Sequence, residues 1–276
     1  MADQRLVERI VCASKEMRKN AIKMTYDMGN TGAHIGGGLS LIEIMAVLYL
    51  AVMKYDVNNL EDEYRDRLIF SKGHGTLALY TAMEQAGIIQ KKDLKLYKKD
   101  DSVFSAHPCM NKRLAIEFSS GSLGQGLSLG VGTALALKKK HNLQSKVYVI
   151  LGDGECDEGS IWEAAASAAH FGLNNIIAVV DVNKLQYDGR TSEVMDLSSL
   201  PLKWSAFGWN VCEVKDGHSV EELLAAFEEE CSAPKVILAN TVKGKGVSFM
   251  ENNPIWHNGR LTDIQFEKAM QEIENG

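Results

Sequence analysis

Hydrophobic positions recur along the chain with two alternating periods, one typical of helices and the other of buried strands. Short apolar runs predict strands over residues 68–70, 147–151, 175–181, 209–214 and 235–242. The helical period predicts helices over residues 5–28, 40–53 and 158–171, with further helices after residues 75, 132, 219 and 262. Because strands and helices alternate, the pattern predicts an α/β fold, a doubly wound parallel sheet with helices on both faces. No internal repeat or linker interrupts it, so we expect residues 1–276 to form a single domain.

Three of the predicted helices begin with a capping signature, in which a hydroxyl residue is followed three positions later by Glu or Gln. The pairs are Ser40 with Glu43, Ser219 with Glu222, and Thr262 with Gln265. We expect each hydroxyl to cap its own helix.

Composition and charge exclude several classes of function. Hydrophobic residues make up 45% of the 276 residues and charged residues 24%, as in a soluble globular protein. The net charge is −6 and the longest basic block is 138–140, which argues against a nucleic-acid partner. The apolar stretch 41–53 is too short to span a bilayer, and no signal peptide is recognisable. Five cysteines without a C-x-x-C pair favour a reducing compartment, so we expect a cytoplasmic protein with Cys156 as a buried filler.

One motif carries the clearest chemistry, the turn Gly152-Asp153-Gly154 followed by Asn183. The turn follows a predicted strand, and Asn183 follows the next strand after one helix. A right-handed strand–helix–strand unit brings both side chains to the same crevice, beyond the carboxyl ends of parallel strands. A carboxylate and an amide oxygen suit a hard divalent cation that also accepts phosphate oxygens. An ordinary nucleotide-type crevice remains the alternative at this point.

Four of the seven histidines lie in predicted loops rich in glycine, proline or asparagine. They are His34, His74, His107 and His257. Loops at the carboxyl edge of a parallel sheet are where catalytic groups gather, and none of these histidines has the spacing of a zinc site. We expect His170 to pack within a helix, His141 to be solvated at a helix end, and His218 to order a turn.

Six segments occur in the order in which they are found in transketolase, and together they extend over essentially the whole chain. They are TGAHIGGGLS, SKGHG, SAHP, SSGSLGQG, GDGECDEG and DVNKLQYDG. The chain therefore resembles the N-terminal, diphosphate-binding domain of transketolase, a thiamine diphosphate enzyme. One departure is His34-Ile35, where the family pattern often has His-Pro, and this leaves the shape of that loop open.

The resemblance implies a role for each matching residue. Mg²⁺ or Ca²⁺ would be held by Asp153, Asn183 and the Leu185 carbonyl. Thiamine diphosphate would be contacted by His74, Gly121, Leu123, Gly154, Asn183 and His257, with Glu158 as the interface carboxylate after the turn. The sugar would face His34, His107 and His257, whose imidazoles suit proton transfer near neutral pH.

The resemblance also implies a partner, because in transketolase the glutamate that activates the cofactor lies in the pyrimidine-binding domain. We therefore expect the N-terminal subunit of a split transketolase, which forms an α2β2 heterotetramer with a separate C-terminal subunit. It would transfer a two-carbon ketol unit from a ketose phosphate to an aldose phosphate. The alternatives are the α-type subunit of a 2-oxo acid dehydrogenase or another thiamine diphosphate enzyme, and a non-catalytic thiamine diphosphate-binding or regulatory protein.

Overall fold

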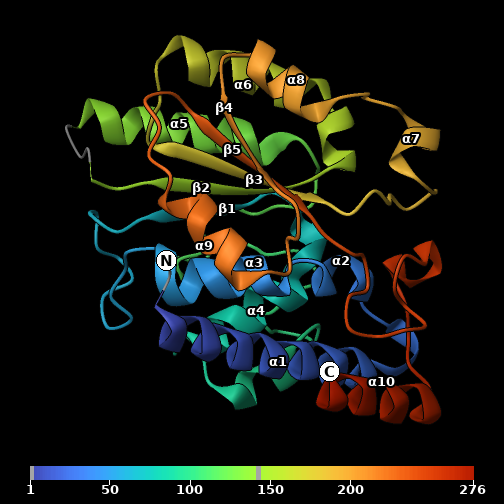
Figure 1. Cartoon of the computed structure of the whole chain (residues 1–276). Helices are drawn as coiled ribbons and strands as arrows, with labels where there is room; N and C mark the ends of the chain where they lie inside the picture. Colours follow the sequence, from blue (N-terminus) through green and yellow to red (C-terminus); the bar gives the residue numbers. More distant parts are fainter. Residues whose placement is uncertain (1–2, 141–143) are drawn as a thin grey trace.

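The computed structural model describes residues 3–140 and 144–276, so His141 lies outside the described residues. At its centre is a parallel sheet of order β1-β2-β3-β5-β4 (Figure 1). The strands are β1 (Arg67–Phe70), β2 (Val147–Gly152), β3 (Ile176–Val182), β4 (Asn210–Val214) and β5 (Lys235–Asn240). Each lies within two residues of an apolar run in the sequence, and the predicted parallel α/β fold is confirmed.

Helices cover both faces of the sheet (Figure 1). One face carries α1 (Gln4–Asp27), α2 (Ile35–Leu39), α3 (Ile42–Val47), α4 (Thr76–Gln85), α9 (Val220–Glu228) and α10 (Asp263–Asn275). The other face carries α5 (Gln125–Lys139), α6 (Gly159–His170) and α8 (Leu200–Ala206). The short α7 (Thr191–Val194) lies at the side of the molecule.

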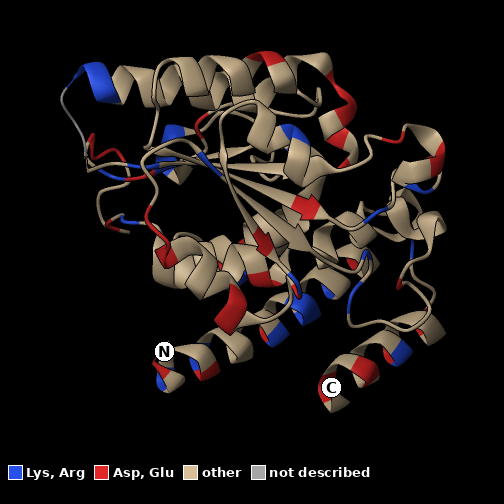
Figure 2. Cartoon of the chain, turned by 45° about the horizontal axis from the view of Figure 1, so that its top comes forward, with Lys and Arg blue, Asp and Glu red and all other residues tan. Residues whose placement is uncertain are grey.

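The central strands are apolar throughout because each contributes side chains to two cores. In β2, Tyr148 and Ile150 pack with the α1 side of the sheet, whereas Val147, Val149 and Leu151 pack with the α5 side. Charged residues lie mainly in helices and loops (Figure 2). Within the described residues, no helix is both long and apolar enough to cross a membrane.

Glycine in α5 lets this helix lie close to the sheet. A Cβ atom at Gly130 would lie 2.6 Å from Cγ2 of Val149 on β2, closer than packed carbons approach. The glycine-rich segment before α5 also lies close to the loop after β1, since a Cβ atom at Gly73 would lie 2.8 Å from the Gly121 amide nitrogen.

The capping predictions have two outcomes. Ser219 and Thr262 accept the expected backbone hydrogen bonds at the starts of α9 and α10. The capping box at Ser40 and Glu43 is wrong, because α3 begins at Ile42 and has no side-chain cap. Both side chains have distant partners instead: Ser40 donates to Asp181 and Glu43 pairs with Arg18. The predicted helix 40–53 also continues as a π-helix over Leu48–Val52.

Candidate active site

A cavity of about 310 Å³ lies at the carboxyl edge of the sheet, among the loops that follow β1, β2, β3 and β5. It brings together every predicted site residue except Glu158. The predicted residues that line it are His34, His74, His107, Gly121, Leu123, Asp153, Gly154, Asn183, Leu185 and His257. Glu158 is exposed at the start of α6 and does not line the cavity.

Asp153 follows β2 directly, and its carboxylate closes the Gly-Asp-Gly turn. One oxygen accepts from the Gly154 amide at 2.9 Å, and the other from the Lys184 amide at 2.5 Å. The side chain is 7% exposed. Burial, with the charge of nearby Asp181, raises the pKa of Asp153 to about 6. A cation bound beside this buried carboxylate would stabilise its ionised form and lower its pKa.

Asn183 follows β3 and its amide has a defined orientation. Nδ2 donates to Oδ2 of Asp181 at 3.2 Å, and Oδ1 accepts from the Leu185 amide at 3.1 Å. The Leu185 carbonyl in turn accepts from Nζ of Lys243 at 2.8 Å. Because a carbonyl oxygen has two lone pairs, this bond leaves the Leu185 oxygen free to accept a second partner.

These donors fit a hard divalent cation. A carboxylate, an amide oxygen and a carbonyl oxygen line one cavity wall, the ligand types that Mg²⁺ and Ca²⁺ prefer. In the described part of the chain, no group of three or more His, Cys, Asp or Glu residues could hold a metal by itself. A cation held by Asp153, Asn183 and the Leu185 carbonyl would have further coordination positions for water or for the oxygens of a bound anion.

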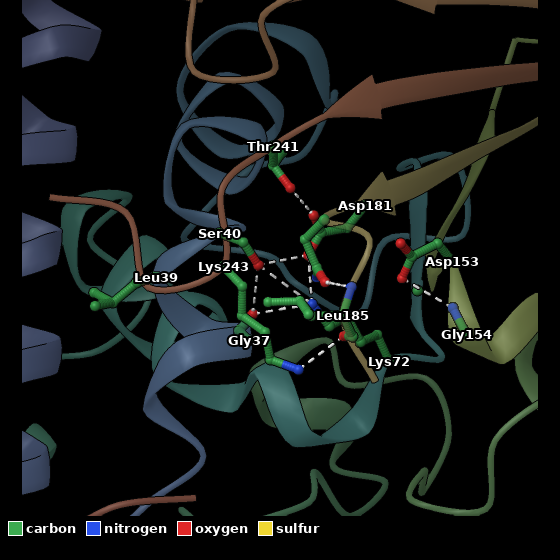
Figure 3. A network of polar contacts seen from close by, with 12 residues as sticks. Gly37, Leu39, Ser40, Lys72, Asp153, Gly154, Asp181, Leu185, Thr241 and Lys243 are labelled. Carbon is green, nitrogen blue, oxygen red and sulfur yellow. Dashed lines mark hydrogen bonds and ion pairs between the residues drawn. The ribbon is translucent and has the colours of Figure 1, made fainter. Parts of the chain in front are cut away.

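A buried ion pair that the sequence analysis missed supports this wall of the cavity. Lys72, 2% exposed, pairs with Oδ2 of Asp181, which is fully buried at the end of β3 (Figure 3). Asp181 also accepts from the Ser40 hydroxyl at 2.6 Å and from the Thr241 hydroxyl. Burial alone would raise the pKa of Asp181, but Lys72 and these hydroxyls hold it below its usual value. The cluster joins the ends of β1, β3 and β5 to α2.

A second buried lysine, Lys243, reaches the Leu185 carbonyl beside this cluster (Figure 3). Nζ of Lys243 donates to the carbonyls of Leu185 and Gln186 at 2.8 and 3.2 Å and lies 3.1 Å from Nδ1 of His257. Burial, with the charge of Lys72, lowers the pKa of Lys243 to about 8. Lys72 is paired with Asp181, so Lys243 is the lysine whose positive charge is presented to a ligand in the cavity.

The four predicted loop histidines form one cluster. The His34 ring centroid lies 5.4 to 5.8 Å from those of His74, His107 and His257, and His74 stacks on His257 at 5.0 Å. Burial and neighbouring positive charges lower the pKa of His34 to about 4 and that of His257 to about 3. These two rings are therefore neutral at pH 7 and present both a donor and an acceptor nitrogen.

Glu155 is another buried group that the sequence analysis did not single out. Its carboxylate accepts from the amides of Gly124 at 2.9 Å and Gly152 at 3.1 Å, and from the Ser71 hydroxyl. It thereby ties the loop after β1, the turn after β2 and the glycine-rich segment before α5 to one another. Gly121, in that segment, has a φ of +138° and lies against the His107 ring.

Comparison with known proteins gives one consistent result. The family model described as "Transketolase, thiamine diphosphate binding domain" matches residues 14–273. The chain is 43% identical over 257 residues to the 6-deoxy-6-sulfo-D-fructose transketolase subunit SqwG of Clostridium sp. (strain MSTE9), covering 91% of this chain and 93% of that protein. It is 38% identical to an apulose-4-phosphate transketolase subunit from Phocaeicola vulgatus, covering 97% of this chain and 94% of that protein.

Longer relatives match along only part of their length. Human transketolase is 34% identical over 98% of this chain, which covers 43% of the human protein. The structure of transketolase from Leishmania mexicana superposes with a TM-score of 0.87 at 29% identity, over 96% of this chain and 41% of that chain.

Proposed function

The chain belongs to the transketolase family through its thiamine diphosphate-binding domain, and we propose that it is the N-terminal subunit of a two-subunit transketolase. The reaction is transfer of a two-carbon ketol group from a ketose or ketose phosphate to an aldose or aldose phosphate. The main support for this proposal is that one cavity is lined by four histidines, by the oxygen donors of the candidate cation site and by two buried lysines.

The oxygen wall is the proposed cation site. Asp153, Asn183 and Leu185 would hold Mg²⁺, or Ca²⁺, and the diphosphate of thiamine diphosphate would complete its ligands. The backbone of Gly154, the imidazoles of His74 and His257, and the Lys243 ammonium line the same cavity and would contact the diphosphate. The positive charge of Lys243 supports this assignment because an ammonium favours a polyanion.

When bound, thiamine diphosphate would supply the electron sink for breaking and forming a carbon–carbon bond. Gly121 and Leu123 would support the aminopyrimidine through their backbone atoms. His34, His107 and His257 would face the sugar. As a neutral ring, His34 can donate a hydrogen bond to a carbonyl and accept one from a hydroxyl, whereas Nδ1 of His257 accepts from the Lys243 ammonium and leaves Nε2 as its donor. These imidazoles would hold and move the protons of the sugar hydroxyls during transfer.

The proposed partner is a C-terminal transketolase subunit that supplies the activating glutamate, in an α2β2 heterotetramer. Two of the relatives are named as subunits, and the chain covers 93% and 94% of their lengths. Exposed apolar side chains near the cavity support a partner surface there. Tyr187, which lines the cavity, is 69% exposed, and Met110, three residues after His107, is 58% exposed. Glu158, exposed at the start of α6, is the proposed interface carboxylate.

Exposed free thiols at Cys12 and Cys109 support a cytoplasmic location.

The identity of the donor sugar is a separate part of the proposal. The names of two relatives suggest 6-deoxy-6-sulfofructose and apulose 4-phosphate as donors, and we add xylulose 5-phosphate as a third ketose to compare. The test is to co-purify this chain with its C-terminal partner, add thiamine diphosphate and Mg²⁺, and follow ketol transfer to an aldose by mass spectrometry.

We expect transfer from at least one of these ketoses and none without the partner. Release of CO₂ from pyruvate without ketol transfer would instead identify a 2-oxo acid enzyme. Tight cofactor binding without turnover of any donor would identify a non-catalytic binding protein.

A further inference from the structure

A second buried polar cluster lies outside the cavity, on the α1 side of the sheet. It consists of Arg18 on α1, Glu43 on α3 and His218 in the turn before α9. Glu43 Oε1 pairs with Arg18, and Glu43 Oε2 lies 2.8 Å from Nδ1 of His218. The side chains of all three are at most 10% exposed. None of them lines the cavity, so the proposed reaction leaves the cluster without a role.

The hydrogen bonds of His218 determine its tautomer. The Val242 amide donates to Nε2 at 2.9 Å, so Nε2 carries a lone pair and not a proton. The ring proton is therefore on Nδ1, where it is donated to Glu43. The carboxylate of Glu43 thus orients an imidazole that holds a backbone amide of the segment after β5, in the way that carboxylates orient metal-binding histidines.

The same cluster holds this segment at a second point. Nη1 of Arg18 donates to the carbonyl of Lys245 at 2.9 Å and to the carbonyl of Leu39 at 3.0 Å. A third tie comes from Gly244, whose amide donates to the Gly36 carbonyl at 3.0 Å. The bonds at positions 242 and 245 therefore lie on either side of Lys243, the lysine whose Nζ reaches the Leu185 carbonyl and His257.

Segment 242–246 is a turn, closed by the bond from the Lys245 amide to the Val242 carbonyl at 3.1 Å, and this local bond does not by itself fix the turn relative to α1 and α3. Gly244 and Gly246 have φ values of +81° and +89°, and the segment contains no helix or strand. A Cβ atom at Gly246 would lie 2.6 Å from Cδ of Arg18, so glycine allows the guanidinium to reach the Lys245 carbonyl.

We propose that Glu43, His218 and Arg18 form a positioning relay that fixes segment 242–246 and thereby places the Lys243 ammonium against the cavity wall. The proposal rests on the proposed function only in assigning the placed ammonium to a diphosphate ligand. Glu43, His218 and Arg18 are positioning residues, since they act through the backbone on either side of Lys243.

The first test is independent of cofactor and partner. Amide hydrogen exchange over segment 242–246 is compared in the full chain and in two variants, His218→Asn and His218→Gln. Asparagine keeps a donor for Glu43 but is too short to reach the Val242 amide, whereas glutamine can place an oxygen near the position of Nε2. We expect exchange at Val242 to be about 10-fold or more faster in His218→Asn and largely restored in His218→Gln.

The control is Asn175→Ala, which removes another buried side-chain hydrogen bond, to the Ala134 carbonyl at the amino end of the sheet. It should leave exchange at residues 242–246 unchanged. Equal exchange in wild type and His218→Asn, or faster exchange in Asn175→Ala to the same extent, would overturn the relay.

The second test is a double-mutant cycle on thiamine diphosphate affinity, measured by calorimetry with Mg²⁺ and the partner subunit. His218→Asn should weaken binding about 10-fold, the usual scale for groups that orient a ligand-binding side chain. In a Lys243→Ala background the same change should alter affinity by less than about 2-fold, because the side chain it positions is gone. An undiminished loss in that background would show a general structural effect and refute the relay. If wild type binds no thiamine diphosphate, the proposed function fails, and the exchange experiment alone decides the relay.

Discussion

The buried pair of Lys72 and Asp181 gives the sharpest test of how the site is held together. Lys72 is 2% exposed and Asp181 0%, so water cannot solvate either charge if its partner is removed. In Lys72→Met, Asp181 keeps three neutral donors, from Ser40, Thr241 and Asn183, but loses the only ammonium that the structure shows bonded to it. In Asp181→Asn, the Lys72 ammonium keeps the Gly37 carbonyl at 3.1 Å and loses the carboxylate.

The expected magnitude follows from this geometry. Breaking a buried pair by removing one partner costs about 3–5 kcal/mol, mostly because the other charge is left buried. We expect Lys72→Met near the lower end, since the three neutral donors still solvate Asp181, and Asp181→Asn near the upper end. The double variant removes both charges, so its cost should fall short of the sum of the single costs by about 2 kcal/mol or more.

Urea unfolding followed by tryptophan fluorescence would measure these free energies of unfolding. The matched control is Lys23→Met, which breaks an ion pair with Asp27 on the surface of α1, where the side chains are 54% and 32% exposed. Such i,i+4 pairs contribute about 0.3–0.5 kcal/mol. If Lys72→Met were no more destabilising than Lys23→Met, or if the double variant were additive, the pair would not support the site as we argue.

Three further predictions concern other parts of the molecule. Asp153→Ala should abolish metal-dependent binding of thiamine diphosphate; unaltered binding by calorimetry, with the partner present, would remove Asp153 from the cation site. His107→Ala should leave the cofactor bound and lower turnover by about 10²-fold or more; turnover at the wild-type rate would show that His107 is not catalytic. Burial alone would raise the pKa of Glu43, but Arg18 and His218 hold it at about 2, below the 4.5 of an unfolded chain. The carboxylate therefore contributes stability above pH 4.5, roughly 3 kcal/mol, that is lost as the pH falls toward 2. Glu43→Gln should be less stable at pH 7 and lose less stability between pH 5 and 3 in urea titrations, and an unchanged acid profile would contradict the ion pair.

The strands and the edge of the sheet that forms the site could be predicted because both depend on local signals. Apolar runs such as Val147–Leu151 are buried on both faces, and the residues that follow them are polar. Parallel strands bring those polar residues to one edge, so Asp153 and Asn183 lie close together as expected. The four loop histidines also lie together in this cavity, as expected.

The supporting residues could not be found in this way because their partners are distant in sequence. Lysine is usually exposed, and nothing local marks Lys72 as buried before Asp181, 109 positions later, comes to it. His218 and Glu43 are 175 positions apart, so the sequence shows only a turn and a helix start. The same contact explains the wrong capping prediction, since a buried partner for Glu43 outweighs a cap of about 1 kcal/mol.

Both buried clusters converge on segment 34–43, whose three glycines let it approach other parts of the chain closely. A Cβ atom would lie 2.7 Å from the Trp256 carbonyl at Gly36, 3.1 Å from the His74 ring at Gly37, and 3.1 Å from Leu77 at Gly38. Carbonyls of this segment accept from Lys72 at Gly37 and from Arg18 at Leu39, so close approach is what both clusters require. The Ile35 amide donates to the Ala33 carbonyl at 2.8 Å, a bond that proline could not make at this position. A backbone hydrogen bond therefore holds the His34 loop where the family pattern often has proline. The segment that carries His34 also accepts hydrogen bonds from Lys72, at Gly37, and from the segment around Lys243, at Gly36.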